Sequence, residues 1–264
     1  MSIKNQRDLD GIRRAGRAVA AILAGMRAAV RPGITTAELD EVGAREMTRL
    51  GARSAPRRVY GFPGVTLISV NDEIVHGVPG DRRLRAGDIV KLDVTAELDG
   101  YIADAAETVV VPPTSDAAAR LGACAREAFA RGLEAAQVGR PVREIGAAVE
   151  GHVRACGFHV VRELCGHGVG RTIHEEPSVP NYDDPFAVSR TDGRPGHHDR
   201  AAHHHRTYAA GNRRRRLDDA HPQRVACRAS RAHDHRLARW CGDRHGRCRV
   251  TSVWRRLGSI APAR

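Results

Sequence analysis

The sequence of 264 residues lacks the features that mark membrane and secreted proteins. Its longest apolar stretch, around residues 18–24, is much shorter than the roughly 20 residues that a membrane-spanning helix needs. The first six residues, Met-Ser-Ile-Lys-Asn-Gln, contain no apolar core of the kind found in signal peptides. We therefore expect a soluble, cytoplasmic protein that has no membrane partner.

Disulfide frameworks and several common catalytic motifs are also missing. The six cysteines form no C-x-x-C pair and have irregular spacing, which fits reduced thiols in the cytoplasm. The chain has no Walker loop, no G-x-S-x-G motif and no H-E-x-x-H motif. These absences argue against a P-loop nucleotide hydrolase, an α/β serine hydrolase and a zincin.

Basic and acidic residues are balanced in only one part of the chain. Residues 1–186 hold 24 Lys and Arg against 25 Asp and Glu, whereas residues 187–264 hold 19 arginines, no lysine and six acidic residues. The net charge of +12 therefore comes from the second segment. We predict one domain over residues 1–186, followed by an Arg- and His-rich segment over residues 187–264. A basic RNA-binding tail and a histidine-rich metal tract are two alternatives for that segment.

Apolar periodicity predicts an α+β fold for the first segment. Apolar residues recur at three- and four-residue steps over residues 8–30, which indicates an amphipathic helix. Thr35 and Glu38 have the spacing of a capping box that opens a second helix, which Gly51 would end. The remaining predicted elements are helices over residues 115–137 and 141–156 and strands over residues 65–70, 89–98, 101–111 and 158–164.

Two parts of the chain repeat each other at an offset of 106 residues. Both contain a helix, a turn, a second helix and a stop at glycine. A duplicated α+β unit of this kind would place two half-sites face to face across a pseudo-two-fold axis. The matched positions are Gly33 with Gly139, Glu38 with Glu144, Leu39 with Ile145, Met47 with Val153 and Gly51 with Gly157.

Asp93 and Asp104 lie eleven residues apart, on either side of the turn signal Asp99-Gly100. On an antiparallel pair of strands both carboxylates could point to one face, although a lone strand aspartate is often only a surface residue. An ionised carboxylate in an apolar strand is costly unless it is paired or binds a metal ion. His167 lies between two glycines, which let the backbone pass close to a ligand. Two carboxylates and an imidazole suit divalent Mn, Fe, Co or Zn.

Four motifs in this order carry a family resemblance. They are Pro32-Gly-Ile-Thr-Thr-Ala-Glu-Leu39, Ser69-Val-Asn-Asp-Glu-Ile-Val-His-Gly-Val-Pro79, Asp93-Val-Thr95 with Asp104, and the block from Cys165 to Pro177. Residues 1–186 resemble the type I methionine aminopeptidases, which are metallohydrolases with the pita-bread fold. The resemblance implies two pseudo-symmetric halves, of which the second is incomplete here.

The resemblance also implies roles for individual residues. Asp93, Asp104 and His167 would be ligands of two divalent metal ions, with Asp104 in the bridging position. His174 would be catalytic, because it matches the histidine that hydrogen-bonds the scissile amide and steadies the tetrahedral intermediate. His76 would contact the substrate near the cleaved bond. Phe62 and Leu67 would line the pocket for the methionine side chain, although many family members have cysteine where Leu67 stands.

The reaction implied is removal of the N-terminal methionine by a hydroxide that bridges the two metal ions. The partners would then be the N-termini of nascent polypeptides, with ribosome association as a further option. We expect a monomer and no specific binding of nucleic acid.

Two expected glutamate ligands are missing, since the family's T-[IV]-E-P and E-H-T segments do not occur in this chain. Both segments are permitted if codons are chosen that encode the present residues and are then read in the frame that starts one nucleotide later. Residues 197–202 then permit Ile-Thr-Ile-Glu-Pro, and residues 231–235 permit Glu-His-Thr followed by Ile or Thr. The recovered glutamates lie 31 residues apart, as is usual in the family. This agreement predicts a single frameshift near residues 187–191.

A frameshift would leave three of five protein ligands and remove the last strands of the second half. We therefore predict disorder over residues 187–264, weak metal binding and impaired aminopeptidase activity. A proline-specific peptidase of the same fold is one alternative. Another is a catalytically silent pita-bread protein that binds ribosomes or RNA through its basic tail.

Overall fold

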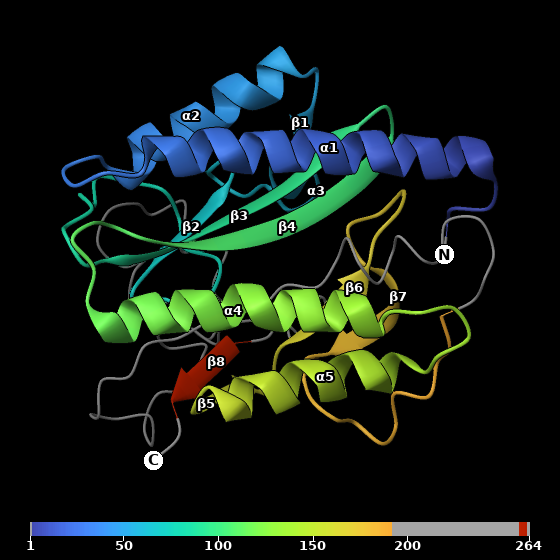
Figure 1. Cartoon of the computed structure of the whole chain (residues 1–264). Coiled ribbons are helices and arrows are strands. Elements are labelled where there is room, and N and C mark those ends of the chain that lie inside the picture. Colours follow the sequence, from blue (N-terminus) through green and yellow to red (C-terminus); the bar gives the residue numbers. More distant parts are fainter. Residues whose placement is uncertain (1, 192–258, 263–264) are drawn as a thin grey trace, which may run out of the picture.

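The computed structural model describes residues 2–191 and 259–262 (Figure 1). The helices are α1 (Gln6–Ala29), α2 (Thr36–Arg49), α3 (Ala55–Tyr60), α4 (Asp116–Ala135) and α5 (Val142–Ala155). The strands are β1 (Arg53–Ser54), β2 (Leu67–Val70), β3 (Ile89–Leu98), β4 (Tyr101–Val110), β5 (Phe158–Val161), β6 (Cys165–Gly168), β7 (Glu175–Pro180) and β8 (Ser259–Pro262). Within the described residues, no helix combines the length and the apolar character needed to cross a membrane.

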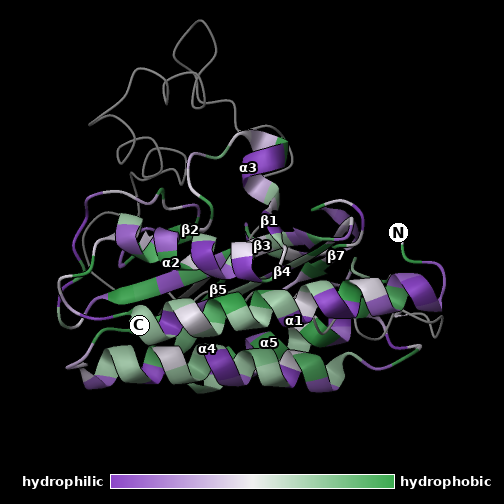
Figure 2. Ribbon diagram, turned by 90° about the horizontal axis from the view of Figure 1, so that it is seen from above, coloured by the Kyte–Doolittle hydropathy of each residue, from purple (hydrophilic) through white to green (hydrophobic). Residues whose placement is uncertain are grey.

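The predicted helix over residues 8–30 is observed as α1, which begins two residues earlier and ends at Ala29. The Asn5 side chain caps α1 by accepting a hydrogen bond from the amide of Asp8. At α2 the predicted capping box is confirmed, since the Glu38 amide donates to Thr35 Oγ1 at 3.0 Å and the Thr35 amide donates to Glu38 Oε2 at 2.7 Å. Hydrophobic and hydrophilic residues share the ribbon of α1, as expected for an amphipathic helix (Figure 2).

The main sheet is antiparallel and built around β3. On one side β3 pairs with β4 along its whole length, and on the other side it pairs with β1 and β2. Helix α1 lies across one face of the β3–β4 ribbon (Figure 1). The even-numbered residues of β3, Val90, Leu92, Val94 and Ala96, are buried in the same apolar cluster as the inner face of α1. Because side chains alternate along a strand, the odd-numbered residues of β3 point to the opposite face.

Helices α4 and α5 pack side by side and form the core of the second half (Figure 1). Their shared apolar cluster contains Leu121, Ala128, Val149, Val153 and Phe158. Strand β5 follows α5 and pairs with β8, and β6 pairs with β7. The predicted strand over residues 158–164 is confirmed only to Val161, since β5 ends there.

The internal repeat is confirmed by backbone hydrogen bonds. In the first half, the amides of Thr36 and Ala37 donate to the carbonyls of Arg82 and Gly80 at 2.9 Å. In the second half, the amides of Val142 and Arg143 donate to the carbonyls of Ser189 and Ala187 at 2.8 and 3.0 Å. An isolated bridge accompanies each set, between Thr35 and Arg83 and between Pro141 and Arg190. The repeat is therefore a duplicated structural unit, and it extends to the residues around position 190.

Part of the segment for which we predict disorder is described by the structure. Residues 187–191 hydrogen-bond to the start of α5 and the turn before it, and residues 259–262 form β8. Residues 192–258 lie outside the described residues, so the expected disorder of that stretch stays a prediction.

Candidate metal centre

The β3–β4 hairpin brings Asp93 and Asp104 to the same face of the sheet. Asp93 lies opposite Ala106 and Asp104 lies opposite Thr95, so the two aspartates are diagonal neighbours across the strand pair. They point to the face opposite α1, and both are buried, with 3% and 2% of their surface exposed. The hydroxyl of Thr95 donates a hydrogen bond to Asp104 Oδ1 at 2.8 Å. The predicted convergence of the two carboxylates is therefore consistent with the strand register.

His167 reaches this face from the other half of the molecule. It lies in β6, where Gly168 is required because a Cβ atom there would come within 2.5 Å of the Glu176 carbonyl oxygen. The amide of Ile102 donates to the carbonyl of Gly170 at 2.7 Å, which ties the loop after β6 to the start of β4. As a result His167 Nε2 lies 3.6 Å from Asp104 Oδ2.

The imidazole of His167 is held in the tautomer that a metal ligand needs. Its Nδ1 atom donates to the carbonyl oxygen of Gly168 at 2.9 Å, so the lone pair is on Nε2, which faces Asp104. Burial lowers the pKa of His167, although the hydrogen bond to Gly168 opposes this shift. The ring is therefore neutral at pH 7, as required for coordination.

His174 lies next to His167 on the loop before β7. The centroids of the two rings are 4.2 Å apart. Burial, followed by the neighbouring His167, lowers the pKa of His174 to about 4, so this ring is also neutral at pH 7. The hydroxyl of Tyr60, at the end of α3, lies 3.1 Å from His174 Nδ1. Nothing in the sequence indicated Tyr60, because no local pattern links α3 to a residue 114 positions away.

The loop that carries His76 is fixed against β2. His76 has a positive φ of 59°. The following residue, Gly77, accepts a hydrogen bond from the Ile68 amide at 3.0 Å and donates one to Ser69 Oγ at 2.9 Å. A Cβ atom on Gly77 would lie 2.1 Å from the Ile68 carbonyl oxygen. The close approach of the loop to β2 therefore depends on glycine at this position.

We expect Gly77→Ala to lower the free energy of unfolding by about 2–4 kcal/mol, because the added methyl group collides with the backbone of β2. Gly80→Ala is the matched control, since a Cβ atom there meets no heavy atom within 4 Å. Urea denaturation of the two variants measures the difference. Equal stability of both variants would show that the loop can move away from β2 at little cost.

Two further predicted residues, Phe62 and Leu67, are each 2% exposed. Leu67 pairs with Asp93 across β2 and β3, so its side chain lies beside the carboxylate on the same face. A second apolar group on this face consists of Ala55, Ile102 and Ile173, with Tyr60 packed against it. Ile102 precedes Asp104 by two residues and therefore lies on the same side of β4. Ile102 was not predicted from the sequence, although its position two residues before Asp104 was a usable signal.

A polar cluster orients the loop that carries His174. The backbone amide and the hydroxyl of Ser2 donate to the two carboxylate oxygens of Glu175 at 2.7 and 2.5 Å. The amide of Arg171 donates to the same carboxylate at 2.9 Å. The N-terminal segment thus fixes the loop, and no local sequence pattern indicated this contact over 173 residues.

The donor set of Asp93, Asp104 and His167 fits divalent metal ions. It consists of two buried carboxylates and a neutral imidazole with its Nε2 lone pair available, a combination that suits Mn, Fe, Co or Zn. With metal–ligand distances of about 2.0–2.2 Å, the 3.6 Å between His167 Nε2 and Asp104 Oδ2 allows both atoms to bind the same ion.

Comparison with known proteins agrees with this geometry. The model of the metallopeptidase family M24 matches residues 10–215. The chain belongs to this family. Methionine aminopeptidase 2 of Bacillus subtilis is 41% identical over 188 residues, which cover 70% of this chain and 76% of that protein. The methionine aminopeptidase of Escherichia coli is 40% identical over 185 residues, covering 69% and 70%.

Solved structures of methionine aminopeptidases superpose on this M24 chain. The methionine aminopeptidase of Thermotoga maritima superposes with a TM-score of 0.70 at 31% identity, over 73% of this chain and 78% of that one. The enzyme of Rickettsia prowazekii gives 0.68 at 32% identity, over 72% and 77%. The prolidase of Pyrococcus furiosus, at 24% identity and a TM-score of 0.59, shares the fold alone. The predicted α+β pita-bread fold and the methionine aminopeptidase resemblance are both confirmed.

Proposed function

We propose that the domain described here is built to remove the N-terminal methionine from nascent polypeptides in the cytoplasm. The observation that carries this proposal is the approach of His167 Nε2 to within 3.6 Å of Asp104 Oδ2, from the other half of the molecule. It supports a site in which Asp93 and Asp104 hold metal ions from β3 and β4, and His167 holds one from β6. Carboxylate and imidazole ligands of this kind suit Co, Mn, Fe or Zn.

Each side chain around the ions has a distinct task in this proposal. When bound, two divalent ions supply an activated water and polarise the scissile carbonyl. A hydrogen bond donated by the Tyr60 hydroxyl to His174 Nδ1 would leave the N–H of the neutral ring on Nε2, where it can hydrogen-bond the substrate amide. Leu67 and Phe62 provide apolar surface for the methionine side chain, and His76 approaches the substrate from the loop fixed on β2.

We expect His174→Ala to lower kcat by about 10²–10³-fold, with a much smaller change in KM, because a hydrogen bond to the reacting group is strongest in the transition state. The assay needs an active protein, so the variant is made with the reading frame restored between codons 187 and 191. His159→Ala is the control, since His159 is exposed on β5. A decrease in kcat of less than tenfold would show that His174 is not catalytic.

We further propose that the chain as written is impaired. In each half, three backbone carbonyls accept hydrogen bonds from the turn before the second helix and from its first residues. These carbonyls belong to residues 80, 82 and 84 in the first half and to residues 187, 189 and 191 in the second, an offset of 107. The same offset along the sequence aligns Asp93, a proposed ligand, with Arg200. Position 200 is where the shifted reading frame permits glutamate. This agreement between the duplicated unit and the shifted frame supports a frameshift near residues 187–191.

The alternative of a silent protein that binds RNA through its tail depends on residues 192–258, which lie outside the described residues. Arginine-rich chains bind phosphate groups without sequence preference whatever their origin. Salt-sensitive affinity for ribosomal RNA that exceeds the affinity for unrelated RNA, and that is lost on removal of residues 187–264, would favour this alternative.

The proposed activity is tested with a Met-Ala peptide and a Gly-Pro peptide, on protein with the restored reading frame. We expect metal-dependent release of methionine from the first and no cleavage of the second. Cleavage of Gly-Pro alone would identify a proline-specific peptidase of the same fold. No cleavage of either peptide, with Mn²⁺ or Co²⁺ present, would contradict the proposal.

A further inference from the structure

A second group of metal-binding side chains lies far from the sheet, between α4 and α5. One ligand atom each from Cys124, His152 and Cys156 lie within 4.8 Å of one another. Cys124 is on α4, His152 is in the last turn of α5, and Cys156 is the residue that caps α5. Cys124 is 2% exposed, and the His152 side chain is 16% exposed.

A fourth ligand is available from α4. Glu127 Oε2 lies 3.4 Å from His152 Nε2, and Cys156 Sγ lies 3.4 Å from the same nitrogen. Glu127 is three residues after Cys124, and Cys156 is four residues after His152, so each pair lies on one side of its helix. Two thiols, an imidazole and a carboxylate therefore converge from two neighbouring helices.

The distances match a tetrahedral ion. With zinc–sulfur distances of about 2.3 Å and zinc–nitrogen or zinc–oxygen distances of about 2.0–2.2 Å, the edges of the tetrahedron are roughly 3.4–3.8 Å. Both distances from His152 Nε2 are 3.4 Å. Cys124, His152 and Cys156 already have ligand atoms within 4.8 Å of one another, and rotation of the exposed Glu127 side chain would bring its carboxylate to the same ion.

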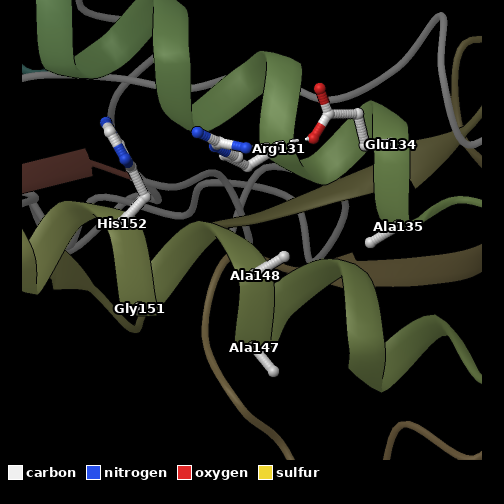
Figure 3. Close-up of a pocket in the computed structure, with 7 residues that line it drawn as sticks. All are labelled: Arg131, Glu134, Ala135, Ala147, Ala148, Gly151 and His152. Carbon is white, nitrogen blue, oxygen red and sulfur yellow. Dashed lines mark hydrogen bonds and ion pairs between the residues drawn. The ribbon is translucent and has the colours of Figure 1, made fainter.

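The site has a route to solvent. An open depression of about 510 Å³ lies between α4 and α5, and His152 lines one end of it (Figure 3). The Arg131 and Glu134 side chains on α4 interact at 3.3 Å and line the same depression. A cation can reach His152 from this depression, and Glu127 is 66% exposed.

We propose that Cys124, Glu127, His152 and Cys156 form a zinc site that fastens α4 to α5. Four protein ligands close the coordination sphere, which is typical of a structural site. Two thiolates favour a borderline-soft ion such as Zn²⁺ over Mn²⁺, so this site and the proposed peptidase centre differ in metal preference. All four residues precede position 187, so the site is independent of any frameshift.

Two thiols close to an imidazole differ from an ordinary single buried cysteine. Cys124 belongs to the apolar cluster of α4 and α5, and a lone thiol there would only fill space. Burial raises the pKa of Cys124 to about 12, so the thiol keeps its proton until a metal ion displaces it. The nearby second thiol also permits a Cys124–Cys156 disulfide, which would exclude zinc and is an outcome of the test below.

Cobalt(II) is the probe, because thiolate ligands give it a charge-transfer absorption that carboxylates and imidazoles do not. The parent protein is the full chain with Cys227→Ser, Cys241→Ser and Cys248→Ser, which leaves three cysteines. We expect one thiolate-ligated cobalt ion, with an absorption equal to two thiolates, whatever cobalt binds at the peptidase centre. Cys156→Ser should halve this absorption and Cys124→Ala with Cys156→Ser should abolish it. Cys165→Ala, a buried cysteine in β6, should leave it unchanged.

Zinc should also raise the midpoint of thermal unfolding more in the parent than in Cys156→Ser, since both keep the peptidase centre and only the parent has both thiols of this site. Cys156 is partly exposed, so its substitution by serine leaves the packed core in place. The proposal is overturned if the thiolate absorption is absent from the parent or persists in the double variant. It is equally overturned if thiol titration of the parent without reductant finds one free thiol instead of three, because that result shows the disulfide.

Discussion

Restoring the reading frame between codons 187 and 191 should raise methionine release from a Met-Ala peptide by at least about 10³-fold over the chain as written. The chain as written supplies Asp93, Asp104 and His167, which cannot by themselves fix two ions and the water between them. The proposed frameshift predicts that the restored frame has glutamate at positions 200 and 231, where this chain has arginine. Rates measured with Mn²⁺ and with Co²⁺ on both proteins provide the comparison.

A matched control separates the loss of activity caused by missing metal ligands from the loss caused by incomplete folding. In the restored protein, replacing the glutamate at position 200 by glutamine keeps the shape of the side chain and removes its charge. We expect this variant to fold and to lose most of the regained activity. Robust metal-dependent release of methionine by the chain as written would contradict the proposed impairment.

Asp104→Asn in the restored protein should lower kcat/KM by about 10³-fold or more, because the proposed bridging carboxylate holds both ions. Asparagine can still accept the hydrogen bond from Thr95 Oγ1, so the hairpin is expected to remain intact. Asp99→Asn is the control, since it makes the same chemical change at the turn of the same hairpin, where the side chain is 62% exposed. The measurement is peptide hydrolysis over a range of Mn²⁺ concentrations.

Stability distinguishes a metal ligand from a structural carboxylate. Without metal, Asp104→Asn should unfold at an equal or higher urea concentration than the parent, because it removes a buried negative charge. A loss of activity below tenfold, or a strong loss of stability without metal, would show that Asp104 has a structural role.

The parts of the fold with local signals could be predicted from the sequence. The capping box of Thr35 and Glu38 fixes the start of α2, and the positive φ of Gly51, directly after the C-cap Leu50, fixes its end. The β3–β4 hairpin follows from two apolar runs around Asp99-Gly100, and both of those residues have positive φ. The duplication could also be predicted, since paired positions such as Leu39 and Ile145 are fully buried.

The elements that were missed lack such signals. Strand β6 consists of Cys165, two glycines and His167, and it has none of the β-branched residues that usually indicate a strand. Helix α3 spans six residues, too short for apolar periodicity to appear. The contacts of Tyr60 with His174 and of Ser2 with Glu175 join residues more than 100 positions apart. Only the folded chain brings these pairs together.

Sequencing the coding DNA from codon 180 to the stop codon tests the central claim most directly. We predict that the frame one nucleotide later encodes the T-I-E-P segment with glutamate at position 200, and the E-H-T segment with glutamate at position 231. Independent reads with one base added or lost near codons 187–191 would show that the intact chain carries the complete ligand set. Codons that encode neither segment in the shifted frame would contradict the account, and residues 187–264 would then belong to the protein's own design.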